Sequence, residues 1–133
     1  MCIRDRFDIP VIGVTGTNGK TTTKTILSSI LSQVGSTHVT EGNFNNEIGV
    51  PLTLLKLNKE HEFSVVEMGA SARSEIGFLS SLALPKIGII TNTSAAHLKG
   101  FGNLEGVVRT KGELFESLPN NGVAILNLSL IHI

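Results

Sequence analysis

A β-branched run meets a glycine-rich turn in residues 11–22, VIGVTGTNGKTT. The segment from Val11 to Thr15 is short and apolar, which predicts a strand that is buried on both faces of a sheet. Glycines at positions 16 and 19 allow the backbone to curl so that several N–H groups point inward. Helical periodicity starts at Thr21, so the stretch predicts a strand, a tight turn and a helix N-terminus in succession.

A strand, a glycine turn and Lys-Thr at a helix start together predict a site for the phosphates of ATP. Lys20 can reach the β- and γ-phosphates, and the Thr21 hydroxyl can bind Mg²⁺. The strict pattern G-x-x-x-x-G-K-[ST] requires glycine where this chain has Val14, so the match is to a shorter form, G-x-x-G-K-T. The competing interpretation is an ordinary glycine turn capped by threonine, but the flanking strand and helix favour the ATP site. The residues expected to bind ATP are Gly16, Thr17, Asn18, Gly19, Lys20, Thr21 and Thr22.

Strands and helices are predicted to alternate along the rest of the chain. The first helix is expected to bury one continuous apolar face and to end near Gly35. This face comprises Ile26, Leu27, Ile30, Leu31 and Val34. Further strands are expected at 37–40, 63–67, 86–92 and 123–127, and further helices from residue 51, at 74–82 and at 104–118. The alternation predicts an α/β fold: a mostly parallel sheet flanked by helices, of the P-loop nucleotide-binding type.

The composition fits one globular domain. Apolar residues make up 41% and charged residues 17% of 133 residues, enough for a hydrophobic core. A formal net charge of zero provides no global field for nucleic acid or an anionic membrane. No apolar run approaches the about 18 residues that a membrane span needs, and no charged and then apolar leader opens the chain. Cys2, the only cysteine, cannot form an internal disulfide, so we expect a cytoplasmic location.

Both ends depart from the pattern of the remaining chain. Residues 1–6, MCIRDR, and residues 128–133, LSLIHI, resemble translated adapter sequence, and native termini are the alternative interpretation. The expected organisation is an N-terminal segment at 1–9, a partial nucleotide-binding domain at 10–127 and a tail at 128–133. We expect the chain to be a truncated piece of a larger protein.

The loop as a whole, residues 15–23 (TGTNGKTTT), resembles the ATP loop of the Mur ligases and of their folylpolyglutamate synthetase relatives. Further stretches resemble the same family in the same order: NFNNEIGVPLT at 43–53, EMGA at 67–70 and NTSAAHLKGFG at 92–102. The likeness covers about residues 10 to 127. It implies the central ATPase domain of an enzyme with three domains, whose N-terminal domain binds a UDP-sugar and whose C-terminal domain closes over ATP.

Within the family, NNEIGVP combined with AAHL is most similar to the member that adds D-alanyl-D-alanine to UDP-MurNAc-tripeptide. This resemblance implies ATP-dependent amide bond formation through an acyl phosphate, in peptidoglycan precursor synthesis. The alternatives are another Mur-type ligase, a folylpolyglutamate synthetase, an ATP-binding fragment without catalysis, or a fragment that does not fold stably. After Asn127 the chain lacks the acidic stretch usual in the family, so we expect this fragment alone to be inactive.

The resemblance also implies metal ligands. Glu67 ends a predicted strand, where α/β proteins place groups that face ligands, and its carboxylate can hold Mg²⁺. The competing interpretation is a strand-end charge that meets solvent. His97 matches a family histidine that helps to hold a second metal ion, although a histidine in a loop is often only solvated. Asn92 lies at the same sheet edge and is expected to position either the loop or the substrate.

Lys111 falls on the apolar face predicted for the helix at 104–118. The other members of this face are Leu104, Val107, Val108, Leu114, Phe115 and Leu118. Burial favours the neutral amine, which can react with CO₂. The resemblance implies that a lysine at this place is carbamylated and binds metal; the alternative is a lysine that extends to the surface. Glu113 is expected to be a solvent-exposed charge.

The polar cluster of Asn43, Asn45, Asn46 and Glu47 is expected, from the resemblance, to contact the UDP-muramoyl-peptide substrate. An asparagine-rich turn is the alternative interpretation. Ser71, Arg73 and Ser74 are also candidates for substrate contact, and a plain turn with a helix cap explains Ser74 equally well. The expected catalytic residues are Lys20, His97 and Lys111, and the expected metal ligands are Thr21, Glu67, His97 and Lys111.

Overall fold

The structure is a computed structural model that describes residues 6–94 and 98–127. Its sheet has five strands in the order β2-β3-β1-β4-β5, and every neighbouring pair is parallel. The strands are β1 (Val11–Thr15), β2 (Thr37–Val39), β3 (Phe63–Glu67), β4 (Ile87–Ile90) and β5 (Val123–Leu126). The α/β class and the parallel sheet predicted from the sequence are confirmed.

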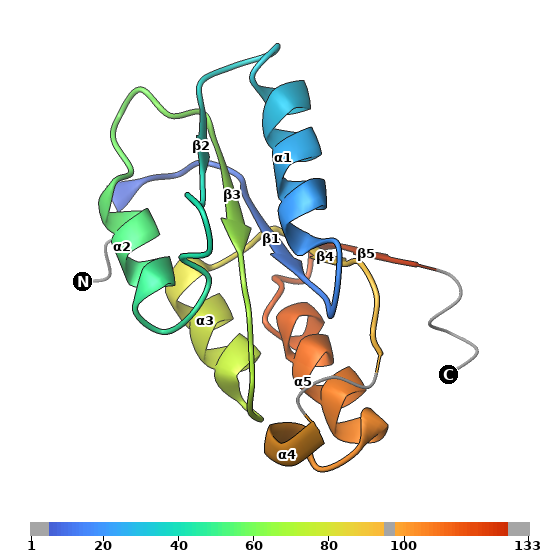
Figure 1. Ribbon diagram of the computed structural model, residues 1–133. Coiled ribbons are helices and arrows are strands. Elements are labelled where there is room, and N and C mark those ends of the chain that lie inside the picture. The colour runs from blue at the N-terminus through green and yellow to red at the C-terminus, as the bar shows by residue number, and fades with distance from the viewer. Residues whose placement is uncertain (1–5, 95–97, 128–133) are drawn as a thin grey trace.

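Helices lie on both faces of the sheet (Figure 1). They are α1 (Lys20–Leu31), α2 (Gly49–Leu55), α3 (Glu75–Ala83), α4 (Leu98–Phe101) and α5 (Leu104–Glu116). The larger hydrophobic cluster joins the sheet to α2, α3 and α5, and the smaller one joins it to α1. In the described part of the chain, no helix is long and apolar enough to cross a membrane.

Two strand glycines allow α5 to pack closely on the sheet. A Cβ added at Gly13 would lie 3.0 Å from Leu114 Cδ1, and one at Gly88 would lie 3.1 Å from Leu114 Cγ. Leu114 is fully buried in this contact, and burial of a leucine side chain stabilises a fold by about 2 kcal/mol. Because glycine has no side chain, these two positions let α5, which carries Lys111, lie close to the sheet.

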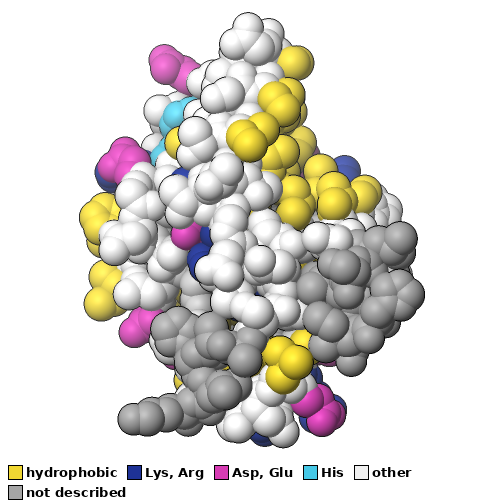
Figure 2. Space-filling view, turned by 45° about the vertical axis from the view of Figure 1, so that its right-hand side comes forward, with side chains coloured by type: hydrophobic (Ala, Val, Ile, Leu, Met, Phe, Trp, Pro, Cys, Tyr) yellow, Lys and Arg dark blue, Asp and Glu magenta, His cyan; other side chains and the backbone are white. Residues whose placement is uncertain are grey.

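The apolar face predicted for α1 is partly wrong. Leu27 and Leu31 pack against the sheet, but Ile26 and Ile30 are 55% and 58% exposed. The reason is Lys24, which is buried on the inner face of α1. The helix therefore does not direct its most apolar side towards the sheet. Figure 2 shows hydrophobic side chains gathered at the surface over α1 and beside it.

Other boundaries differ by small amounts. Helix α1 ends at Leu31, before Gly35, and the short helix α4 was not predicted. On α5, Val107 and Leu114 are buried as expected, but Val108 is 41% exposed. Strand β5 pairs only with β4 within the described residues, and all its residues are exposed.

Candidate ATP site

The loop of residues 16–19, which is predicted to bind phosphate and is called the phosphate loop below, lies where β1 ends, beside the end of β4. Gly16 and Glu67 follow or end neighbouring strands, as expected of a ligand site at the carboxyl edge of a parallel sheet. Gly16 has φ 151°, and a Cβ there would collide with the side chain of Thr91. Gly19 has φ 81°, which favours glycine. The loop therefore needs glycine at both positions.

Residues after β4 brace the loop. The Thr17 N–H donates to the Asn92 carbonyl (3.0 Å), and the Asn18 N–H donates to Asn92 Oδ1 (2.8 Å). From the neighbouring residue, Thr91 Oγ1 donates to the Asn18 carbonyl (2.6 Å). Of the two roles expected for Asn92, the hydrogen bonds demonstrate the first, which is to position the loop.

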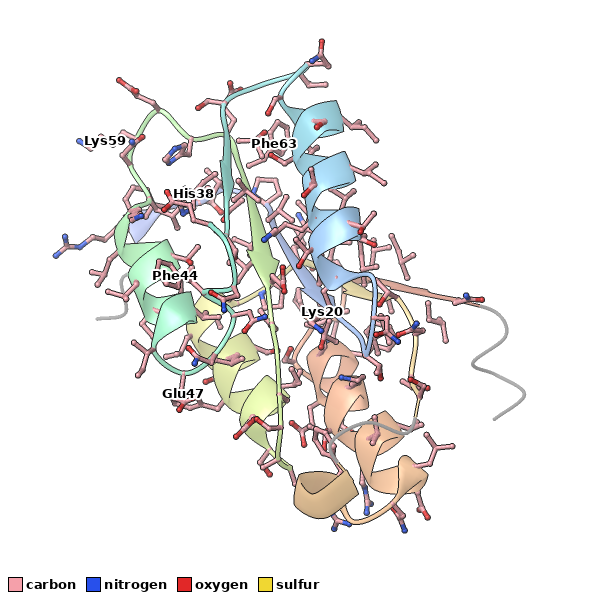
Figure 3. All side chains as sticks on the ribbon, in the orientation of Figure 1. Lys20, His38, Phe44, Glu47, Lys59 and Phe63 are labelled. Carbon is pink, nitrogen blue, oxygen red and sulfur yellow. The ribbon has the colours of Figure 1, made fainter. Side chains whose placement is uncertain are left out.

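The N-terminus of α1 presents free donors. Among the described residues, no acceptor meets the backbone N–H groups of Lys20, Thr21 and Thr22, and no side chain caps the helix. These groups and the helix dipole favour an anion. Lys20 Nζ donates to the carbonyls of Gly16 (3.0 Å) and Thr17 (3.4 Å), so the ammonium is held over its own loop. Figure 3 shows Lys20 at the beginning of α1, near α5.

Glu67 meets Thr21 at the end of β3. Thr21 Oγ1 donates to Glu67 Oε2 (3.1 Å), and Asn45 Nδ2 donates to Oε1 (2.9 Å). Lys24 Nζ lies 3.0 Å from Oε2 in a buried ion pair. Burial raises the pKa of Glu67, but hydrogen bonds from Asn45, Lys24 and Thr21 and the charge of Lys24 outweigh it and lower that pKa overall. The carboxylate is therefore ionised and shielded, not open to solvent.

Lys111 approaches the loop from α5. Its side chain is 4% exposed, which rules out a lysine that extends to the surface. Burial, and then the charge of Lys20, lower the pKa of Lys111 to about 8. Both lysines line a cavity of about 30 Å³, together with Gly16, Thr17, Ala70, Phe101 and Val107. The α5 lysine thus has a substantial neutral fraction near pH 8, next to the phosphate loop.

A larger groove of about 360 Å³ leads away from Lys20. Its other lining residues are Asn45, Asn46, Glu47, Gly69, Ala70, Ser71 and Glu75. Three of the four polar residues expected to contact substrate therefore share a groove with the phosphate-loop lysine, and Asn43 lies outside that lining. The amide of Asn46 is engaged, because its Oδ1 accepts from the N–H groups of Ile48 (3.2 Å) and Gly49 (2.9 Å) at the start of α2.

The chain is similar to known proteins over most of its length. The family model of the Mur ligase middle domain matches residues 14–130. This chain belongs to the Mur ligase family. It is 47% identical to the UDP-N-acetylmuramoyl-tripeptide--D-alanyl-D-alanine ligase of Escherichia coli and 48% identical to that of Synechocystis, over 94% and 93% of its length. The chain spans 28% and 27% of these relatives, so it corresponds to less than a third of each.

Solved structures agree with this assignment. MurF from Acinetobacter baumannii superposes with a TM-score of 0.90 at 43% identity, covering 93% of this chain and 28% of that one. MurF from Thermotoga maritima, solved in complex with ADP, superposes with a TM-score of 0.87 at 39% identity, covering 93% and 29%. The resemblance drawn from the four sequence motifs is confirmed, including its preference for the D-alanyl-D-alanine-adding member.

The structure of this Mur ligase domain corrects one sequence-based expectation. Glu113 is not a solvent charge: its oxygens accept from the N–H groups of Ser74 (3.0 Å) and Gly77 (2.8 Å) and so cap α3 from α5. Arg73 donates to the Phe101 carbonyl (3.0 and 3.2 Å). Ser74 makes no side-chain cap, whereas Ser71 lines the groove. Arg73 and Glu113 therefore hold the Mur ligase helices together.

The expected metal ligands are only partly brought together. Thr21 and Glu67 touch, Lys111 lies on the cavity shared with Lys20, and His97 falls outside the described residues. Within residues 6–94 and 98–127, no cluster of three or more His, Cys, Asp or Glu is placed to hold a metal ion. Sequence reasoning missed Lys24; its spacing of four residues from Lys20, on the face of Leu27 and Leu31, was the available signal.

Proposed function

We propose that this chain is the nucleotide-binding part of an ATP-dependent ligase that joins D-alanyl-D-alanine to UDP-MurNAc-tripeptide. The observation that carries the proposal is the phosphate loop: uncapped N–H groups of α1 and the Lys20 ammonium stand at the head of a groove. The substrates come from the printed names of relatives that are 47% and 48% identical. We also propose a cytoplasmic location, which the resemblance implies.

In the proposed reaction, a substrate carboxylate oxygen attacks the γ-phosphorus of ATP, the bond to the β-phosphate oxygen breaks, and ADP leaves. The acyl phosphate that forms is attacked at its acyl carbon by the amine of D-alanyl-D-alanine. Phosphate then leaves, and the amine loses a proton. The Lys20 ammonium and the free backbone N–H groups of Lys20, Thr21 and Thr22, in the segment of residues 16–22, bind the phosphates and offset the charge that develops on them. The groove residues Asn45, Asn46 and Glu47, with Asn43 from the same segment, would align the acceptor.

The residues at the loop fit a hard divalent cation. Thr21 and Glu67 supply a hydroxyl and a carboxylate whose oxygens lie 3.1 Å apart, and oxygen ligands suit Mg²⁺. The ion would neutralise phosphate charge. We propose His97 and carbamylated Lys111 as ligands of a second ion, and the lowered pKa of Lys111 supports the carbamate because only the neutral amine reacts with CO₂.

A chimera tests the proposal: this chain replaces the matching segment of the Escherichia coli relative, and ADP release is measured with both substrates. Lys20→Ala should lower turnover by about 100-fold or more, because an electrostatic contact to the transferred phosphoryl group is lost. Lys59→Ala, an exposed lysine in another loop (Figure 3), is the matched control and should leave turnover unchanged. Equal turnover in all three proteins would exclude the loop from catalysis.

A further inference from the structure

Lys24 is a buried cation to which the proposed reaction assigns no role. Its side chain lies on the inner face of α1, one turn after Lys20, and is 5% exposed. Its ammonium donates to the Gly42 carbonyl (2.9 Å) and pairs with Glu67 Oε2 (3.0 Å). A lysine at this depth is expensive to bury unless its contacts are specific.

The contacts of Glu67 define what Lys24 can do. One carboxylate oxygen accepts from Asn45, and the other accepts from both Lys24 and Thr21. Glu67 is only 2% exposed, because these donors and the core enclose it. A cation can therefore reach the carboxylate only if a donor gives way. Thr21 is the exposed member, and its hydroxyl can itself become a ligand.

Charge then decides the affinity of this place for a cation. Lys24 already neutralises Glu67, so the pair carries no net negative charge that would attract a free divalent cation. The cation also meets the repulsion of the nearby ammonium. At an effective dielectric constant of about 20, a unit charge about 5 Å away changes an affinity by tenfold or more. A nucleotide brings its own negative phosphates, which outweigh the single ammonium.

We propose that Lys24 is a positioning residue that holds Glu67 beside Thr21 and keeps the affinity of this site for a free divalent cation low. The cation then binds together with the nucleotide and not ahead of it. Through Gly42, the same ammonium ties the segment before Asn45 to α1, so one side chain joins the phosphate-loop helix to the wall of the groove. This inference rests on the proposed function in one respect, which is that Thr21 and Glu67 form the cation site.

The test is a titration of the chain with Mn²⁺, followed by electron paramagnetic resonance, without nucleotide and then with ADP. Lys24→Met removes the charge and keeps most of the length, and Lys24→Gln also keeps a hydrogen-bond donor. Both variants should bind free Mn²⁺ about tenfold more tightly than the unaltered chain, and ADP should reduce that difference. Lys56→Met is the matched control, because its ion pair with Glu41 lies at the surface and it should change nothing.

Two further variants control for the possibility that Lys24→Met fails to fold. Lys24→Met combined with Glu67→Gln carries no buried charge at this place, so it should regain the stability that Lys24→Met loses. The same double variant should lack the tight Mn²⁺ site expected of Lys24→Met, and Glu67→Gln alone should weaken the Mn²⁺ binding that accompanies ADP. Unchanged or weaker Mn²⁺ binding in both Lys24 variants would overturn the inference. If Glu67→Gln also left Mn²⁺ binding unchanged, the cation site of the proposed function would fail with it; ADP binding that is lost in Lys20→Ala would still uphold the phosphate loop.

Discussion

Two buried lysines approach the phosphate loop from opposite faces of the sheet, Lys24 from α1 and Lys111 from α5. The two residues are equally enclosed, at 4% exposure each. Lys24 has a carboxylate at 3.0 Å, whereas none of the described residues forms a salt bridge with Lys111, and Lys20 is the charge that acts on it. The difference indicates that the neighbouring charge separates a buried lysine that is held as a counter-ion from one whose pKa falls to about 8.

The largest effect should come from breaking the α1 pair. Lys24→Ala leaves the Glu67 carboxylate buried without its counter-ion, and we expect the free energy of unfolding to fall by about 4 kcal/mol. Urea denaturation measures this loss. Lys56→Ala, which breaks the exposed pair with Glu41, should change stability by less than about 1 kcal/mol. Similar losses in both variants would mean that the buried pair has no special weight.

A smaller effect should follow from loosening the helix that carries Lys111. Leu114→Ala opens a cavity against Gly13 and Gly88 and should cost about 3 kcal/mol. Water admitted beside Lys111 should also raise the pKa of its amine towards the usual range, which lysine-acetylation rates followed by mass spectrometry would detect. Leu52→Ala, at an exposed position of α2, is the control. An unchanged acetylation rate at Lys111 would argue that Leu114 does not keep that site dry.

The smallest effect is a pH dependence confined to Lys111. Its folded pKa of about 8 lies below the unfolded value near 10.5, so between these values the unfolded chain binds more protons. The destabilisation caused by charged, buried Lys111 is therefore fully present below pH 8. The free energy of unfolding should rise by about 2 kcal/mol as the pH increases from about 8 towards 10.5. Urea denaturation at pH 7 and pH 10 measures the rise. Lys111→Met should remove it, and Lys86→Met, at an exposed position, should not.

The sequence predicted the fold because its strands are short β-branched runs separated by helical periodicity, and each signal is local. The burial of Lys111 was predicted correctly for the same reason, since its apolar neighbours are on its own helix, and its role stays a prediction. Lys24 and Glu113 were missed or misjudged because their partners, Glu67 and the N–H groups of α3, lie far away in the sequence. Periodicity favoured Ile26 and Ile30 as inner residues, and it cannot anticipate that an ion pair takes their place.

The outer edge of β5 has a practical consequence for the solution measurements. Among residues 6–94 and 98–127, β5 pairs only with β4, and Val123, Ile125 and Leu126 are exposed, so a second copy can add to this strand edge to edge. Each experiment therefore needs a dilution series. A denaturation curve or titration that changes with protein concentration reports association between molecules and not the chemistry of the phosphate loop.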